Sequence, residues 1–258
     1  MHRFFVLLFS LALAPLASAQ QIAVTNPSFE ADPITPGAFF VLQPDGWATY
    51  DPLGIVDQAL NAVGVIRPAP GLEYFPGGVT DGEHAAIVYL GGEQNGAAGL
   101  QQTLAATLQP DTRYTLRVDV GNIASGTSLP GSSGGPDVFF DLDGFPGYRI
   151  ELLAGGSVLA ADANSLAALI PEGAFSTATV QFDSIGVPAL LGQPLAIRLI
   201  NLDLPGTAQA PGIEVDFDNV RLLATPVPEP AAWVLLLGGF ALLSVQWLRP
   251  PDRRVHRA

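Results

Sequence analysis

Much of the chain consists of short segments in which apolar and polar residues alternate, separated by glycine and proline. Every second side chain is apolar in residues 114–120 (YTLRVDV) and in residues 213–217 (IEVDF). A period of two is typical of a strand that buries one face and exposes the other. Helical periods are scarce, and residues 161–169 are the best candidate for a short helix. The pattern therefore predicts an all-β antiparallel sandwich or jelly roll, with further strands at 85–90, 148–152, 178–182 and 196–202.

The alternation in the last of these segments slips by one position. After Phe217 the apolar pattern is interrupted at Asp218 and Asn219, and it resumes with Val220 and Leu222. A slip of one residue moves every later side chain to the opposite face of a strand. The pattern therefore predicts a bulge or a bend at Asp218.

The two ends of the chain have patterns of their own. Residues 1–19 combine Arg3, an apolar run and a final Ala-Ser-Ala, which is typical of a cleaved secretory signal peptide. Residues 231–248 are apolar and would extend about 27 Å as a helix, just enough to cross a membrane. We therefore expect a signal peptide at 1–19, a β-sandwich domain at 20–224, a linker at 225–230, a transmembrane helix at 231–248 and a basic cytoplasmic tail at 249–258.

The predicted domain is strongly acidic. Residues 20–228 contain six arginines, no lysine and 22 carboxylates, so a phosphate backbone would be repelled and nucleic-acid binding is not expected. The acidic excess indicates either a solvated surface or ligands for divalent cations. The chain also has no cysteine, which excludes disulfides and thiolate chemistry.

The predicted domain offers few residues for catalysis. Its single histidine is His84, which rules out a metal site of the H-E-x-x-H type, and without a G-x-S-x-G sequence a Ser-His-Asp triad has no motif to build on. Two carboxylates could still hydrolyse a glycosidic bond, but no pair stands out by its spacing. We therefore expect no enzyme activity and assign no catalytic residue, with a carboxylate-based glycoside hydrolase as the less favoured alternative.

Several stretches of the domain resemble the galactose-binding-like jelly-roll domains, the fold of many carbohydrate-binding modules. They are N-P-S-F-E at 26–30 followed by Gly46-Trp47, D-G at 81–82, L-Q-Q-T-L at 100–104, P-D-T-R-Y-T-L at 110–116 and the closing segment 213–222. In that family an opening glutamate and a closing aspartate often bind a structural calcium ion, which the resemblance places at Glu30 and Asp218. Sugar sites of that family do not transfer by motif, so Trp47 and Tyr50 are chosen as aromatic residues that could stack on a sugar ring.

The C-terminal segment resembles the PEP-CTERM sorting signals of exported proteins in Gram-negative, exopolysaccharide-producing bacteria. The resemblance implies processing by an exosortase-type enzyme, with an ordinary single-pass membrane anchor as the alternative. It makes the sorting motif Pro228, Glu229 and Pro230, and it makes the basic stop Arg249, Arg253, Arg254 and Arg257.

Together these patterns predict an exported, non-catalytic protein of the cell envelope or the exopolysaccharide matrix. It would begin as a precursor tethered to the inner membrane and end at the cell surface or in the extracellular matrix. Its expected partners are the processing enzyme, the membrane and a polysaccharide that it binds. The alternative is a structural matrix protein without a ligand site.

Overall fold

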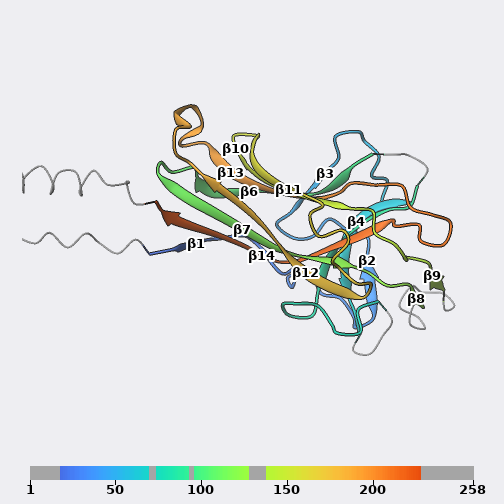
Figure 1. The fold of residues 1–258 in the computed structure, drawn as a ribbon. Helices are drawn as coiled ribbons and strands as arrows, with labels where there is room; N and C mark the ends of the chain where they lie inside the picture. The colour runs from blue at the N-terminus through green and yellow to red at the C-terminus, as the bar shows by residue number, and fades with distance from the viewer. Residues whose placement is uncertain (1–17, 70–73, 93–95, 128–137, 228–258) are drawn as a thin grey trace, which may run out of the picture. The chain divides into compact units, whose positions relative to one another are not determined.

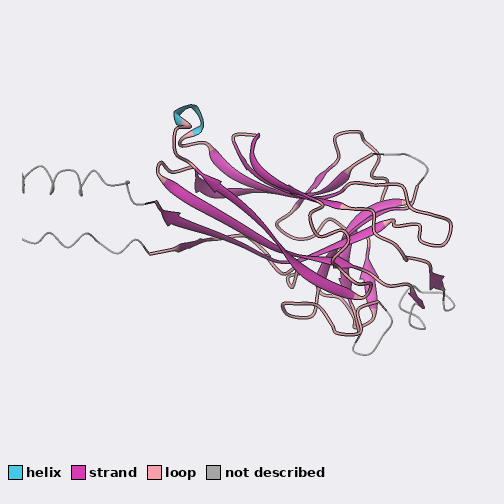
Figure 2. Ribbon diagram, in the orientation of Figure 1, coloured by secondary structure: helices cyan, strands magenta, loops and turns pink. Residues whose placement is uncertain are grey.

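The computed structural model describes residues 18–69, 74–92, 96–127 and 138–227. Within these ranges almost every regular element is a strand, all strand pairs are antiparallel, and the single helix is a short 3₁₀ turn at Pro188–Leu190 (Figure 2). The prediction of an all-β antiparallel sandwich is therefore confirmed.

Two large sheets form the sandwich (Figure 1). The seven-stranded sheet has the order β12 (Ala174–Asp183), β7 (Thr112–Asn122), β14 (Glu214–Pro226), β5 (Ala85–Leu90), β4 (Asn61–Arg67) and β2 (Ala38–Phe40), and β1 (Gln20–Ile22) also pairs with β14. The five-stranded sheet has the order β11 (Ser157–Ala163), β10 (Tyr148–Ala154), β13 (Pro194–Asn201), β6 (Ala98–Thr107) and β3 (Ala48–Tyr50). A third sheet contains only β8 (Gly126–Thr127) and β9 (Phe139–Phe140).

The predicted details of the strands are mostly confirmed. All six expected strands exist, and the slip near Asp218 is a real irregularity, because the register of β14 against β7 shifts between Asp218 and Arg221. Asn219 at this point has a φ of 52°, a left-handed conformation that asparagine tolerates better than most residues. The predicted helix at 161–169 is wrong: β11 continues to Ala163, and turns follow it.

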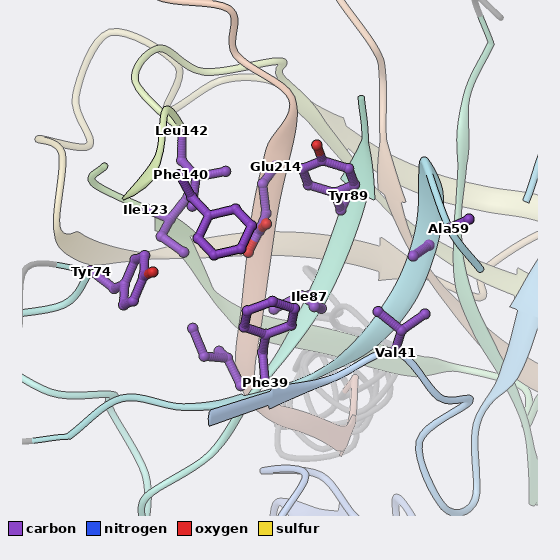
Figure 3. A pocket seen from close by; sticks show the side chains of 12 residues that line it. Phe39, Val41, Ala59, Tyr74, Ile87, Tyr89, Ile123, Phe140, Leu142 and Glu214 are labelled. Atoms are coloured by element: carbon purple, nitrogen blue, oxygen red, sulfur yellow. The ribbon is translucent and has the colours of Figure 1, made fainter. Parts of the chain in front are cut away.

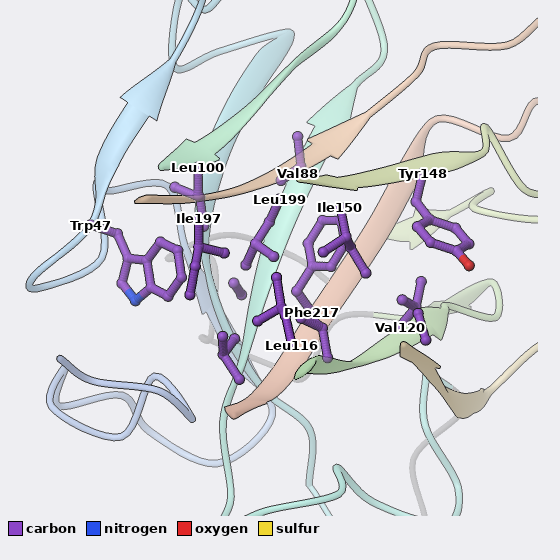
Figure 4. Packing of buried hydrophobic residues seen from close by; sticks show 14 of the residues in the cluster. Trp47, Val88, Leu100, Leu116, Val120, Tyr148, Ile150, Ile197, Leu199 and Phe217 are labelled. Atoms are coloured by element: carbon purple, nitrogen blue, oxygen red, sulfur yellow. The ribbon is translucent and has the colours of Figure 1, made fainter. Parts of the chain in front are cut away.

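The main core fills the space between the two large sheets. It contains the inward side chains of both sheets, among them Trp47, Leu100, Ile197 and Phe217 (Figure 4). Val215 and Phe217 reach this core from β14, and both are fully buried. Burial of such a side chain contributes about 1.5–3 kcal/mol, so each inward position of the alternation stabilises the sandwich.

A second apolar cluster covers the opposite face of the seven-stranded sheet. It includes Tyr74 and Phe75 from a loop, Ile87 from β5, Ile123 after β7 and Phe175 from β12. The alternation had predicted that this face would be exposed to solvent, and that expectation is wrong for this part of the sheet. Loop residues and neighbouring strands cover it, so β5 is buried on both faces.

The predicted terminal elements lie largely outside the described residues. This holds for residues 1–17 of the signal peptide, the sorting motif at 228–230, the apolar run at 231–248 and the arginine cluster. Among the residues that the structure describes, no helix is long and apolar enough to cross a membrane.

Candidate functional site

A cavity of about 130 Å³ lies within the second cluster, on the face of the seven-stranded sheet that points away from the main core. Strands β5 and β14 form its floor, and β2, β4 and the segment at β9 contribute its sides (Figure 3). None of the described lining residues carries a positive charge, and only one carries a carboxyl group. They are Phe39, Val41, Ala59, Ala62, Ile66, Tyr74, Ile87, Tyr89, Ile123, Phe140, Leu142 and Glu214.

Glu214 is the carboxyl group in this apolar cavity. It is the first residue of β14, where it pairs with Tyr89 of β5, and alternation directs its side chain away from Val215 and the main core. The side chain lies among the rings of Phe39, Phe140 and Tyr89 (Figure 3) and is only 5% exposed. Burial raises the pKa of Glu214 to about 8, so the carboxyl group holds its proton at neutral pH.

Asp216 lies two residues further along the same face of β14. It is fully buried, and neither of its carboxyl oxygens has a hydrogen-bond partner among the described residues. Burial raises the pKa of Asp216 well above its usual range, and Glu214 raises it further whenever Glu214 is ionised. An ionised carboxylate without a partner would be very costly here, so Asp216 is neutral as well.

Gly121 explains how Asp216 is covered. It is the register partner of Asp216 on β7, and a Cβ at this position would come within 2.6 Å of the Phe175 ring and 2.9 Å of the Asp216 Cβ. Only a glycine therefore allows Phe175 to close over the sheet here. The result is a dry floor beside the cavity.

Aromatic rings form much of the remaining wall. The rings of Phe39 and Phe140 meet edge to face, with centroids 5.5 Å apart, although they come from different sheets. The pKa of Tyr89 is raised, first by burial and then by the charge on Glu214, so its phenol stays neutral. A neutral acid among aromatic faces can transfer a proton to an apolar ligand, and the faces can then stabilise the resulting cation.

The aromatic residues chosen from the sequence do not belong to this site. Trp47 is 2% exposed, donates its indole N–H to the carbonyl of Asn26 at 3.1 Å and packs against Phe29. A ring buried in this way offers no face to a ligand, so its assignment as an exposed platform is wrong. Tyr50 is half-buried on the five-stranded sheet, where the guanidinium of Arg198 lies 4.5 Å from its ring centre.

Glu30 and Asp218 contact the same loop from opposite ends. The Glu30 carboxylate accepts the backbone N–H groups of residues 83–84 at 2.6 and 2.7 Å, and Asp218 accepts those of residues 80–81 at 2.9 and 2.8 Å. Both therefore act as hydrogen-bond acceptors that hold this loop. Within the described ranges, no group of three or more His, Cys, Asp or Glu side chains is placed to hold a metal ion.

Sequence reasoning did not find Glu214 or the cavity, although the chain contains a signal for them. Residues 85–90 (AAIVYL) and 61–67 (NAVGVIR) are apolar at positions of both parities, which is typical of strands buried on both faces. Such strands require a second covering layer. The acidic residues of 213–217 next to them should then have been expected in a buried setting.

The chain is similar to known cyclases. The family model described as HpiC1-like, HpiC1 cyclase, matches residues 20–223. The solved Stig cyclase Fisc from Fischerella sp. TAU, in complex with (3Z)-3-(1-methyl-2-pyrrolidinylidene)-3H-indole, is 44% identical, and the match covers 81% of this chain and 100% of that chain with a TM-score of 0.68. A cyclase from Fischerella sp. TAU in complex with 4-(1H-indol-3-yl)butan-2-one is 43% identical, with 81% and 98% covered and a TM-score of 0.69. No curated protein matches the chain.

These similarities correct the functional predictions. A non-catalytic glycan-binding or matrix protein is wrong, because the matching family and the similar solved proteins are cyclases. The expectation of a polysaccharide and an exosortase-type enzyme as partners is also wrong, because the similar solved proteins are cyclases in complex with indole compounds. The family model spans most of the sequence and the similarity extends over almost the whole of those cyclases, so the chain belongs to the HpiC1-like cyclase family.

Proposed function

We propose that the chain catalyses the acid-promoted cyclisation of a small, apolar, indole-containing substrate. The observation that carries this proposal is the buried carboxyl group of Glu214, held in an apolar cavity whose described lining has no positive charge. An acid with a pKa near the working pH is well suited to general acid catalysis. The indole compounds bound by the similar cyclases support the substrate class.

The reaction needs only one proton, which Glu214 donates and later accepts again. Glu214 donates its O–H proton to a C=C or C=N bond of the substrate, which leaves a glutamate carboxylate and a substrate cation. A π-electron pair of the substrate attacks the cationic carbon and forms the new ring bond. Loss of a proton from the cyclised cation to Glu214 then restores the acid, so the product is an isomer of the substrate and no oxidant or reductant is required.

The cavity wall protects the cation. Water would trap a cation of this kind as an alcohol, and the apolar lining excludes it. The rings of Phe39, Phe140 and Tyr89 surround the position of the acid, and an aromatic face near a cation contributes about 0.5–2 kcal/mol. The low local dielectric also strengthens the attraction between the new carboxylate and the cation.

A Glu214→Gln variant tests the acid. The amide keeps the shape of the side chain but cannot donate an acidic proton, so we expect cyclisation of an indole with an unsaturated side chain to fall about 10²- to 10⁴-fold. Asp111→Asn is the matched control, since Asp111 is an exposed turn residue with a φ of 48°, which asparagine also accepts. Product isomers are measured by chromatography and NMR. Full activity of Glu214→Gln would exclude this function.

We propose that Glu30 and Asp218 hold a structural calcium ion. Hard cations prefer carboxylate oxygens, and the carboxylates of Glu30 and Asp218 hold the two ends of one loop. Neither residue lines the cavity, so the ion has no part in proton transfer. The melting temperature is expected to rise with calcium and fall with excess chelator, and the double variant E30Q/D218N should lose the response. Unchanged melting of the wild type in chelator would contradict the proposal.

We also propose that the sandwich has a galactose-binding-like jelly-roll topology.

We propose further that residues 1–19 direct export of the chain. The precursor would be tethered to the inner membrane by residues 231–248 and would reach the cell surface or the extracellular matrix. The signal-peptide pattern and the apolar run support this location. Cell fractionation with the intact mass of the mature chain tests it. A cytoplasmic chain that retains residues 1–19 would contradict it.

A further inference from the structure

We propose that Phe39 determines substrate size by closing the cavity against Phe140, so that a ligand larger than a single aromatic ring must displace the Phe39 side chain. This inference rests on the proposed function in one respect, the use of an indole compound as the ligand. It concerns the access and selectivity of the site rather than the acid.

The cavity is small in comparison with an indole compound. An engineered protein cavity of about 150 Å³ takes up benzene. The cavity here is about 130 Å³, which is room for one six-membered ring. The indole compounds found in the similar cyclases consist of a fused bicycle and a further ring or a four-carbon chain. Such a compound is therefore too large to enter this cavity whole while the walls stay where they are.

The walls of the cavity differ in the number of strands that pair with them. The floor belongs to β5 and β14, which are central strands with a partner on each side. In contrast, Phe39 lies on the three-residue edge strand β2, and Phe140 lies on β9, which pairs only with the two-residue β8. Because these two elements have the fewest backbone hydrogen bonds around the cavity, they are the walls that can yield.

The two weakly paired walls contact each other through the rings of Phe39 and Phe140. The Phe39 and Phe140 rings are 5.5 Å apart at an interplanar angle of 89°, the favoured edge-to-face arrangement. Both residues are half-buried, and Val41, which follows on the same face of the chain as Phe39, is 38% exposed and also lines the cavity. Figure 3 shows the Phe39 ring next to Glu214. An opening at Phe39 would thus connect the acid with the solvent along an apolar path past Val41.

Binding of two probes to three variants tests the inference. Benzene fits the closed cavity, and 4-(1H-indol-3-yl)butan-2-one does not. Removal of the ring in Phe39→Ala removes a contact present only in the closed state, so the affinity for the indole probe should rise about two- to tenfold. Benzene should bind no more tightly than before. Phe39→Trp should weaken the indole probe, and Phe40→Ala is the matched control, since Phe40 points to the opposite face and is 45% exposed.

The outcomes separate this inference from the proposed function. The inference is supported if the ratio of the affinities for the two probes changes in Phe39→Ala but not in Phe40→Ala. This holds even if no cyclisation is found. Equal changes for both probes, or failure of the indole probe to bind Phe39→Ala, would overturn it. If Glu214→Gln abolishes cyclisation while the Phe39 variants keep the wild-type selectivity, the function stands and the role of Phe39 does not.

Discussion

The two faces of β14 at residues 214–217 have the same burial but opposite chemistry. Val215 and Phe217 point into the core between the sheets, whereas Glu214 and Asp216 point into the second cluster. All four side chains are at most 5% exposed. One face contributes stability by packing, and the other places two carboxyl groups among apolar and aromatic side chains.

Burial therefore has opposite energetic effects on the two faces of β14. Apolar side chains gain free energy when they leave water, but a carboxyl group loses hydration and must stay protonated to be tolerated. The second face therefore weakens the fold above the ordinary pKa of a carboxyl group. The burial that weakens this face is the same burial that produces the proposed acid, as expected where activity and stability conflict.

The largest effect is expected on the packing face. Phe217→Ala leaves a hole in the main core and should lower the free energy of unfolding by about 3–5 kcal/mol at pH 6. Phe139→Ala is the control, because Phe139 is 64% exposed and its loss should cost less than about 0.5 kcal/mol. Chemical denaturation measures both. Equal losses for the two variants would remove the distinction between the faces of β14.

A smaller effect, dependent on pH, is expected on the acidic face. The pKa of Glu214 is about 8 in the folded chain and near 4.5 when unfolded, so between these values only the folded state holds the proton. Stability therefore falls as the pH rises through this window, by roughly 2–4 kcal/mol for this group. Glu214→Gln should match the wild type at pH 4.5 and exceed it at pH 8.

The control for this prediction is Asp111→Asn, which should keep the wild-type slope of stability against pH. Asp216 acts in the same direction as Glu214, because burial also raises its pKa. The slope in Glu214→Gln should therefore become shallower without vanishing. An unchanged slope would mean that Glu214 is ionised in the folded state, and the proposed acid would then be wrong.

Some features of the fold could be predicted from the sequence, and others could not. The period of two placed β7, β10 and β14 and located the irregularity at Asp218, because these features depend on local alternation. The second layer depends on loop residues such as Tyr74 and Phe75, which fold back over the sheet through long-range contacts. Alternation alone cannot show that such a loop covers a polar face.

The candidate site was missed for the same physical reason. Glu214 and Asp216 have the sequence pattern of solvent-exposed residues, and only the covering layer raises their pKa values. Trp47 was chosen because its loop-like surroundings suggested exposure, but its indole N–H is satisfied by a backbone carbonyl within the core. Glu30 and Asp218 were selected by resemblance, and in the structure both accept hydrogen bonds from the same loop, at residues 80–84.

The smallest effect is expected beyond the irregularity, where the polar face of β14 does reach the solvent. There Arg221 forms an ion pair with Asp119 at 2.9 Å, and the arginine side chain is 37% exposed. The Asp119 side chain is only 6% exposed, but it also accepts hydrogen bonds from Thr177 and Asn219. Because these remain and the guanidinium is partly hydrated, Arg221→Gln should lower the free energy of unfolding by about 1 kcal/mol, with little dependence on pH between 5 and 8. Thermal melts at low and high salt measure this. A larger loss would show that the polar residues beyond Asp218 affect the free energy of unfolding as strongly as Glu214 and Asp216 do. Exposure to water would then not explain the difference between the two parts of β14.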